Sequence, residues 1–229
     1  MTIGIIGAMD EEINLLLGNM TDKQEQVIAN TMFVQGKLLE REVVLLKSGI
    51  GKVNAAMATT IMHEHYSPSC VINTGSAGGF SEDSEVGDIV ISSEVVHHDV
   101  DVTAFEYKYG QVPGMPAAFV ADETLIHKAN EVVNRLSVRS SIGMIATGDS
   151  FMDDQARVAL VKEKFPTMIA SEMEAAAVAQ VCYQYDKPFL VLRALSDIAG
   201  KDSSISFDAF LTTAAKNASN IIMEMIKEI

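Results

Sequence analysis

The sequence has few basic residues and few cysteines. Only 17 lysines and arginines stand against 31 aspartates and glutamates in 229 residues, so the formal net charge is −14. Such a charge repels nucleic-acid phosphates, and we therefore predict no nucleic-acid partner. The two cysteines, Cys70 and Cys182, each lie within an apolar run, as buried reduced thiols do. This usage predicts a cytoplasmic protein.

Long apolar runs and internal divisions are also missing. No apolar stretch reaches the roughly 20 residues of a membrane-spanning helix, and the first residues lack the apolar segment of a secretory signal. The chain contains no repeat, low-complexity tract or linker that would divide it. We therefore expect one domain over residues 1–229 and no membrane partner.

What the sequence does contain is an alternation of apolar strands and helices. This order predicts an α/β fold, a three-layer sandwich in which a twisted mixed sheet is flanked by helices. The predicted strands cover residues 3–7, 32–38, 43–47, 71–73, 89–96, 142–146, 168–171 and 189–195. The predicted helices cover residues 11–18, 52–66, 122–136, 155–165, 175–185 and 207–229.

Residues 100–121 do not fit this alternation. They combine two glycines and two prolines with four aromatic residues, among them Phe105. A loop of this length in a compact domain is usually functional or disordered. Exposed aromatic side chains favour an interface over disorder, so we predict a dimer contact whose side chains reach the pocket of the partner.

Carboxylates follow three of the predicted strands. Glu12, Glu174 and Asp197 come after the strands 3–7, 168–171 and 189–195. Ligands of open α/β sheets bind outside the carboxyl ends of the strands, so we expect the three acids to share one crevice. Each acid also has an ordinary explanation, as a residue that complements a helix dipole or as a turn aspartate. Their convergence favours a site for a neutral or cationic ligand.

Other motifs carry weaker signals. The glycine-rich residues 73–79 are compatible with an anion-binding nest or with a tight turn. Residues 48–52 lack the spacing of a P-loop and are more typical of a turn. His97 and His98 precede acidic residues that suit a metal, but neighbouring strand residues point to opposite faces. We therefore predict no metal site.

Converging carboxylates suit the cleavage of a bond between a sugar and a purine. One carboxylic acid protonates the departing base, while a carboxylate directs water at the anomeric carbon. A further carboxylate on the ribose hydroxyls stabilises the developing positive charge. Burial can keep one acid protonated near neutral pH. Asp197, which follows an apolar strand, is the expected proton donor, and Glu12, at a helix start, is the expected ionised group.

An ordered set of motifs spans nearly the whole chain. They are residues 4–9 with Glu11 and Glu12, residues 48–53 and 73–78, His98-Asp99 with Asp101, and residues 103–105, 148–151, 172–175 and 193–197. This set resembles the purine nucleoside phosphorylase-type superfamily. Within it, the set is similar to the bacterial nucleosidases that cleave 5′-methylthioadenosine and S-adenosylhomocysteine.

The resemblance implies a hydrolase of methionine salvage that releases adenine and a 5′-thio-ribose product. It also implies that the enzyme uses no metal and no organic cofactor, and that it is a homodimer in the cytoplasm. Glu12 would activate water, Asp197 would protonate purine N7, and Glu174 would hold the ribose hydroxyls. The substrate-binding residues that it implies are Met9, Ile50, Ser76, Ala77, Gly78, Phe151, Met152, Glu172, Met173, Arg193, Ser196 and Phe207, with Val102, Phe105 and Pro113 from the neighbouring subunit.

The chain departs from the family pattern at four positions. Asp10 replaces a usual glutamate, His97 a tyrosine, Met152 an isoleucine and Ser171 a valine. None is a catalytic carboxylate, but Ser171 lies on the strand under the site, which leaves the substrate preference open.

Three alternatives also remain open. A phosphorylase of the same fold would need arginines for phosphate, and residues 4–18 contain none. A futalosine-type nucleosidase would differ mainly in its 5′ pocket. A non-catalytic nucleoside-binding protein would not need both Glu12 and Asp197.

Overall fold

One ten-stranded mixed sheet forms the centre of the protein in the computed structural model, which describes residues 1–199 and 203–229. The strands are β1 (Ile3–Gly7), β2 (Met20–Ile28), β3 (Thr31–Leu38), β4 (Arg41–Lys47), β5 (Cys70–Gly79), β6 (Ile89–His97), β7 (Phe119–Val120), β8 (Ser140–Thr147), β9 (Met168–Glu172) and β10 (Phe189–Ile198). The helices are α1 (Asp10–Asn19), α2 (Lys52–Tyr66), α3 (Glu123–Arg135), α4 (Gln155–Lys164), α5 (Ala175–Gln184) and α6 (Ser203–Ile226), with a 3₁₀ turn η1 at Thr103–Phe105.

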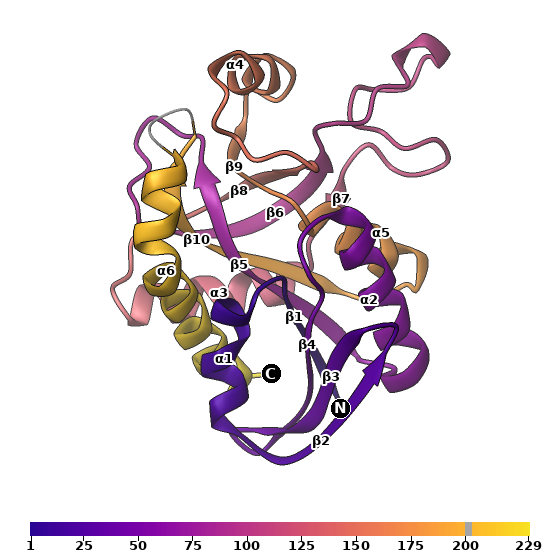
Figure 1. Ribbon diagram of the computed structural model, residues 1–229, viewed down its shortest axis with the longest axis vertical. Helices are drawn as coiled ribbons and strands as arrows, with labels where there is room; N and C mark the ends of the chain where they lie inside the picture. Colours follow the sequence, from indigo (N-terminus) through magenta and orange to yellow (C-terminus); the bar gives the residue numbers. More distant parts are fainter. Residues whose placement is uncertain (200–202) are drawn as a thin grey trace.

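Helices cover both faces of the sheet. Helices α1, α3 and α6 lie on one side and α2 and α5 on the other, while α4 stands at the end of the molecule near β8 and β9 (Figure 1). Since both faces are covered, the central strands are apolar throughout, and every residue of β1 is buried. The predicted three-layer α/β fold is confirmed. Within residues 1–199 and 203–229, no helix combines the length and apolar character needed to cross a membrane.

Half of the sheet closes on itself. Strand β10 pairs with β5 on one side and β6 on the other, and the order β5–β9–β8–β6–β10 completes a ring. The predicted strand at 71–73 was too short, because β5 continues through the glycine-rich residues to Gly79. Glycine weakens a strand, but these residues pair with β10 and β9 in the tertiary fold. They form a strand and not a tight turn.

Several further elements differ from the expectation, among them the short strand β7, which was not predicted, and α6, which begins at Ser203 and ends at Ile226. Helix α1 continues through Gly18 to Asn19, so that glycine does not end it. Strand β2 was not predicted, because it pairs only with β3 at the edge of the sheet and most of its side chains are exposed. An exposed polar edge strand lacks the apolar alternation by which strands are recognised.

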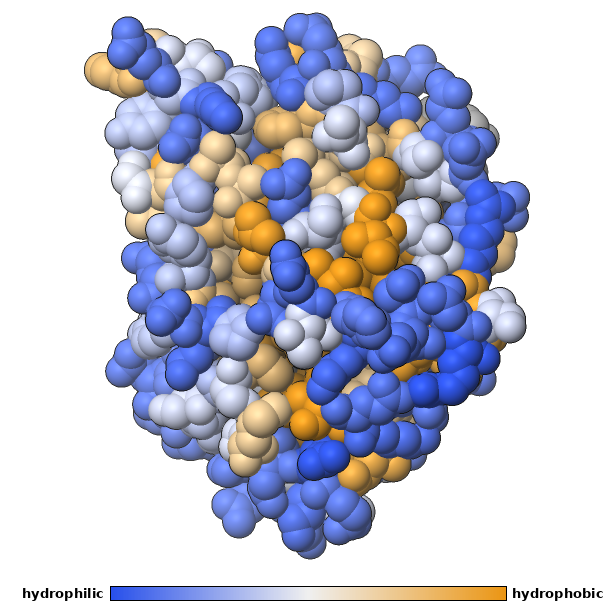
Figure 2. Space-filling model, turned by 180° about the vertical axis from the view of Figure 1, so that it is seen from behind, coloured by the Kyte–Doolittle hydropathy of each residue, from blue (hydrophilic) through white to orange (hydrophobic). Residues whose placement is uncertain are grey.

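The segment of residues 100–118 projects from the body of the protein as an arm (Figure 1). Seen from the opposite side, the arm extends at the upper left, and apolar side chains gather across the middle of that face (Figure 2). Phe105, at the η1 turn, is 74% exposed. The other aromatic residues are not all free for an interface, because Phe119 is buried and Tyr109 packs on Phe165 with ring centroids 5.9 Å apart.

Candidate active site

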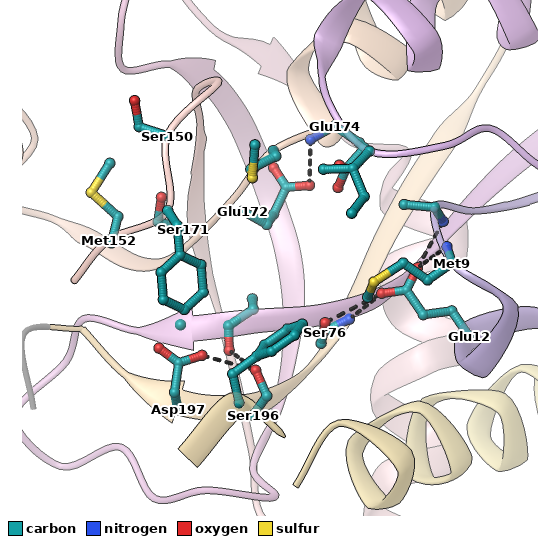
Figure 3. A pocket seen from close by; sticks show the side chains of 17 residues that line it. Met9, Glu12, Ser76, Ser150, Met152, Ser171, Glu172, Glu174, Ser196 and Asp197 are labelled. Atoms are coloured by element: carbon teal, nitrogen blue, oxygen red, sulfur yellow. Dashed lines mark hydrogen bonds between the residues drawn. The ribbon is translucent and has the colours of Figure 1, made fainter. Parts of the chain in front are cut away.

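A cavity of about 210 Å³ opens at the carboxyl ends of β1, β5, β9 and β10, where loops and the start of α6 complete it. The structure brings Glu12, Glu174 and Asp197 together in its lining (Figure 3). The complete lining is Ala8, Met9, Glu12, Ile50, Ser76, Ala77, Gly78, Ser150, Phe151, Met152, Ser171, Glu172, Met173, Glu174, Ser196, Asp197 and Phe207.

Glu12 is held at one end of the cavity by four donors. One carboxylate oxygen accepts the backbone N–H groups of Ala8 at 2.7 Å and Met9 at 3.2 Å. The other accepts the N–H of Ser76 at 2.9 Å and its hydroxyl at 3.3 Å. A Cβ at Gly75 would overlap this carboxylate, so glycine is required there for the close approach of β5. These bonds fix a buried carboxylate in one orientation.

Asp197 lies at the other end of the cavity, near the end of β10. It is 2% exposed, and one of its carboxyl oxygens accepts the Ser196 hydroxyl at 2.9 Å. A bulge in β10 between Leu195 and Asp197 sets its register, and Asp197 is paired with Gly78 of β5. A Cβ at Gly78 would lie 3.1 Å from the second carboxyl oxygen. The glycine thus leaves space beside the acid for a flat ligand.

Glu172, which lines the cavity, forms a buried ion pair with Arg193, which lies behind it. The Arg193 guanidinium also donates to Asn73 at 2.7 Å. Glu172 accepts the Thr147 hydroxyl and the backbone N–H groups of Glu174 and Ala175, both at 2.9 Å. Although burial opposes its charge, Arg193 and these donors hold the pKa of Glu172 below its usual value. The ion pair therefore fixes the backbone that carries Glu174.

Glu174 has a different electrostatic environment. Burial, reinforced by the negative charge of Glu172, raises its pKa to about 8. The Arg193 guanidinium, 3.9 Å from the Glu174 carboxyl, and the N–H of Gly51, 2.9 Å away, act in the opposite direction. The pKa values of these two adjacent carboxyl groups are thus displaced in opposite directions, downward for Glu172 and upward for Glu174.

The turn at residues 148–152 forms the wall that carries Phe151 and Met152. Three polar groups, which we call the clasp (Lys52, Asp99 and Asp149), anchor it. Asp99 accepts the Lys52 ammonium at 2.5 Å and the backbone N–H of Asp149 at 3.0 Å. The Asp149 carboxylate accepts the backbone N–H of Lys52 at 2.8 Å. The clasp ties the turn to the start of α2, directly beside the Gly51 N–H that contacts Glu174.

Most of the predicted site residues line this one cavity. Arg193 is the exception within the core, since it lies behind Glu172 and contacts that residue instead of the cavity. Val102, Phe105 and Pro113, predicted for a neighbouring subunit, lie on the arm and do not line the cavity of their own chain. Phe207 near the start of α6 meets Phe151 edge to face, with centroids 5.7 Å apart.

Sequence reasoning missed several contributors to the site. Ala8, Ser150 and Ser171 line the cavity; Ala8 and Ser150 lie within recognised motifs, and Ser171 adjoins one. Gly51 contributes only its backbone N–H, and Gly75 only its lack of a side chain. Every residue has a backbone, so contributions of this kind cannot be predicted from the residue type. The only signal in the sequence is the glycine itself.

The histidines next to the arm belong to the packing of the protein. His97 and His98 are buried, and burial lowers the pKa of both. His97 bonds to the Gln180 amide at 3.0 Å, and the His98 ring fills the space beside Gly148. Over residues 1–199 and 203–229, no group of three or more histidines, cysteines or acidic residues is arranged to hold a metal ion.

The site therefore places two carboxyl groups at opposite ends of a cavity and a third between them along its wall (Figure 3). Glu12 lies next to backbone donors just after β1 and within β5, Asp197 lies beside Gly78, and Glu174 lies above both in this view. The arrangement can hold a sugar between two acids and a flat base near Asp197. Its chemistry suits acid–base cleavage of a bond between the two.

The chain matches known proteins over its full length. The model of the phosphorylase superfamily matches residues 2–227. The 5′-methylthioadenosine/S-adenosylhomocysteine nucleosidase of Oceanobacillus iheyensis is 61% identical over 229 residues, 100% of each chain. The solved structure of the corresponding Neisseria meningitidis nucleosidase, in complex with methylthio-immucillin-A, has a TM-score of 0.98 at 44% identity and covers 100% of this chain and 99% of that one. The Colwellia psychrerythraea nucleosidase in complex with adenine has a TM-score of 0.97 at 47% identity, over 100% and 95%.

Proposed function

Because this chain belongs to the phosphorylase superfamily, and full-length relatives are 5′-methylthioadenosine/S-adenosylhomocysteine nucleosidases, we propose that it hydrolyses the N-glycosidic bonds of both nucleosides. The products are adenine and the corresponding 5′-thio-ribose, and the reaction belongs to methionine salvage. The whole chain, residues 1–229, acts as one nucleosidase domain. The observation that carries the proposal is the placement of Glu12 and Asp197 at opposite ends of one cavity.

Glu12 is the proposed general base. Three of its four donors are backbone N–H groups, which keep the carboxylate in place. The Ser76 hydroxyl, at 3.3 Å, is the most distant of the four and can rotate away. Water takes that position, gives a proton to Glu12 and attacks the anomeric carbon as the bond to the base breaks.

Asp197 is the proposed general acid. It gives its proton to purine N7, so that the base leaves as neutral adenine and carries no negative charge. The Ser196 hydroxyl, which donates to Asp197, keeps the carboxyl group oriented toward the slot over Gly78. We also propose that Phe151 stacks on the base and that the backbone of Met152 contacts the edge of the base.

Glu174 is the proposed ribose-binding group. It lies on the wall between the other two acids, and the ion pair of Glu172 and Arg193 fixes its backbone. Its carboxyl group accepts hydrogen bonds from the ribose hydroxyls and, when ionised, stabilises the positive charge that develops on the sugar. Arg193 is thereby a positioning residue.

A homodimer is part of the proposal. Phe105 on the arm is 74% exposed and Val53 on α2 is 79% exposed, and in the proposed dimer the partner subunit covers both side chains. Val102, Phe105 and Pro113 of one subunit then close the 5′-thio end of the pocket of the other. The compartment is the cytoplasm, as the two free buried cysteines suggest.

The test is the release of adenine from 5′-methylthioadenosine in buffer without phosphate. We expect rapid release that added phosphate does not accelerate, because water is the nucleophile. Release of adenine only in the presence of phosphate would show that the enzyme is a phosphorylase. Glu12 would then not be the base that activates water. Cleavage of a futalosine-type nucleoside in preference to 5′-methylthioadenosine, measured as the loss of the nucleoside, would assign the other 5′ substituent.

A further inference from the structure

Ser171 carries a buried hydroxyl group that the protein does not use. The residue is 4% exposed, and no hydrogen-bond partner for its oxygen occurs among the residues that the structure describes. A buried hydroxyl without a partner is destabilising, and most such groups in folded proteins are satisfied. Ser171 also lines the cavity, at the end of the site that contains Met152 and Asp197 (Figure 3). A ligand in this cavity is therefore a candidate for the missing partner.

Strand pairing places Ser171 opposite Asp197. Gly78 of β5 is paired with Ser171 of β9 on one side and with Asp197 of β10 on the other. Residues directly opposite each other on neighbouring strands point to the same face of a sheet, so the two side chains flank the glycine. They are separated by two strand spacings, about 10 Å between backbones. Since Gly78 has no side chain, this rung of the sheet is a slot with a hydroxyl at one edge and a carboxyl at the other.

We propose that Ser171 is a specificity-determining residue of the base subsite, whose hydroxyl hydrogen-bonds directly to a nitrogen of the purine that Asp197 does not contact. The inference rests on the proposed function, because it takes the base to lie over Gly78 with N7 toward Asp197. Rotation about the single Cα–Cβ bond is enough to turn the hydroxyl from its position in the ligand-free protein toward a base in the slot.

The inference predicts opposite effects on stability and on binding. Ser171→Ala removes a group that has no protein partner, so the melting temperature of the ligand-free protein should stay the same or rise. The inhibition constant of adenine should rise about fivefold, the usual size of one neutral hydrogen bond. Ser171→Cys, which keeps the shape but donates weakly, should also weaken adenine binding.

Ser92→Ala is the matched control. Ser92 is a fully buried serine of the same sheet, but its hydroxyl accepts the backbone N–H of Val191 at 3.0 Å. This variant should lower the melting temperature and leave the inhibition constant of adenine unchanged. If Ser171→Ala instead behaved like Ser92→Ala, the Ser171 hydroxyl would have a protein partner and the inference would be overturned.

Purine analogues identify the nitrogen. The inhibition constants of 1-deazaadenine, 3-deazaadenine and purine, each of which lacks one nitrogen of adenine, are measured for the wild type and Ser171→Ala. The fivefold difference should disappear for one analogue and remain for the other two. A difference that is the same for all three, or no difference with adenine, would overturn the inference alone. Failure of the wild type to bind adenine would overturn the proposed function and the inference with it.

Discussion

At the scale of single residues, Asp197 is the group on which the proposed proton transfer depends. Asp197→Asn keeps the shape of the side chain but cannot supply a proton. We expect kcat to fall about 10²-fold or more, as on the loss of a general acid, while substrate binding persists. Adenine release gives kcat, and calorimetry with 5′-methylthioadenosine gives the dissociation constant. Unchanged turnover would show that another group protonates the base.

Glu174 predicts a pH dependence of stability. Its pKa in the folded protein is about 8, against an ordinary value of 4.5. Between these values the folded protein binds more protons than the unfolded chain, so the free energy of unfolding falls as the pH rises through this window. Glu174→Gln cannot titrate but can still accept the Gly51 N–H. We expect its melting temperature, without ligand, to decline less than that of the wild type from about pH 5 to about pH 9.

Glu172 does not obscure that comparison. Its folded pKa is lowered, so the stability that it contributes is present above the ordinary value and is lost only as the pH falls further. Parallel melting curves for the wild type and Glu174→Gln would mean that Glu174 is already ionised in the ligand-free site.

At the scale of elements, the clasp connects the start of α2 to the turn at residues 148–152. Asp99→Asn replaces the charge that holds Lys52 and weakens one of the two bonds of Asp99. We expect the KM and the inhibition constant of adenine to rise together about fivefold, the effect of roughly 1 kcal/mol, because the turn carries Phe151. The kcat should change less, since no reacting group is moved.

A distant ion pair provides the control for the clasp. Glu85 pairs with Arg139 at 2.7 Å on the surface, and neither residue lines the cavity. Glu85→Gln should leave both the KM and the inhibition constant of adenine unchanged. If Asp99→Asn lowered the melting temperature without raising the inhibition constant of adenine, the clasp would serve stability alone.

At the scale of elements, local sequence signals were sufficient to predict some of the strands and helix starts. Apolar runs such as 3–7 and the Asp122 cap, which accepts the N–H of Leu125 at 2.9 Å, are local signals and predict β1 and the start of α3. The full length of β5 is not a local property. Its residues from Gly75 to Gly79 have low strand propensity, and pairing with β9 and β10 makes them a strand. The site was recognised by its carboxylates, whereas the Gly51 N–H and the Ser171 environment depend on tertiary contacts.

At the scale of the whole molecule, a shared pocket predicts that two defective chains complement each other. Phe105→Ala should impair the partner's pocket, and Glu12→Gln its own. In a mixed dimer, one site combines Glu12 of the Phe105→Ala chain with Phe105 of the Glu12→Gln chain, and this site is complete. An equal mixture, after subunit exchange, should regain about a quarter of the wild-type activity if dimers form at random.

Two controls accompany that experiment. Mixing two chains that both carry Glu12→Gln should restore no activity. Light scattering should give the mass of a dimer for each variant. A monomeric mass at working concentration, or no recovery in the mixture, would contradict the role of the arm.

The closed ring of strands also determines how the protein opens. Strand β5 is hydrogen bonded to β10 along one side and to β1 and β9 along the other, so its backbone amides can exchange with solvent deuterium only when the ring itself unfolds. Ser76, Gly78 and Asp197 lie on this ring, while Phe151 lies on a turn outside it. The floor of the cavity thus belongs to the most cooperative unit of the fold, and its wall to a less stable one. Nucleosides can enter through local opening of the wall while Asp197, on the floor, keeps its geometry.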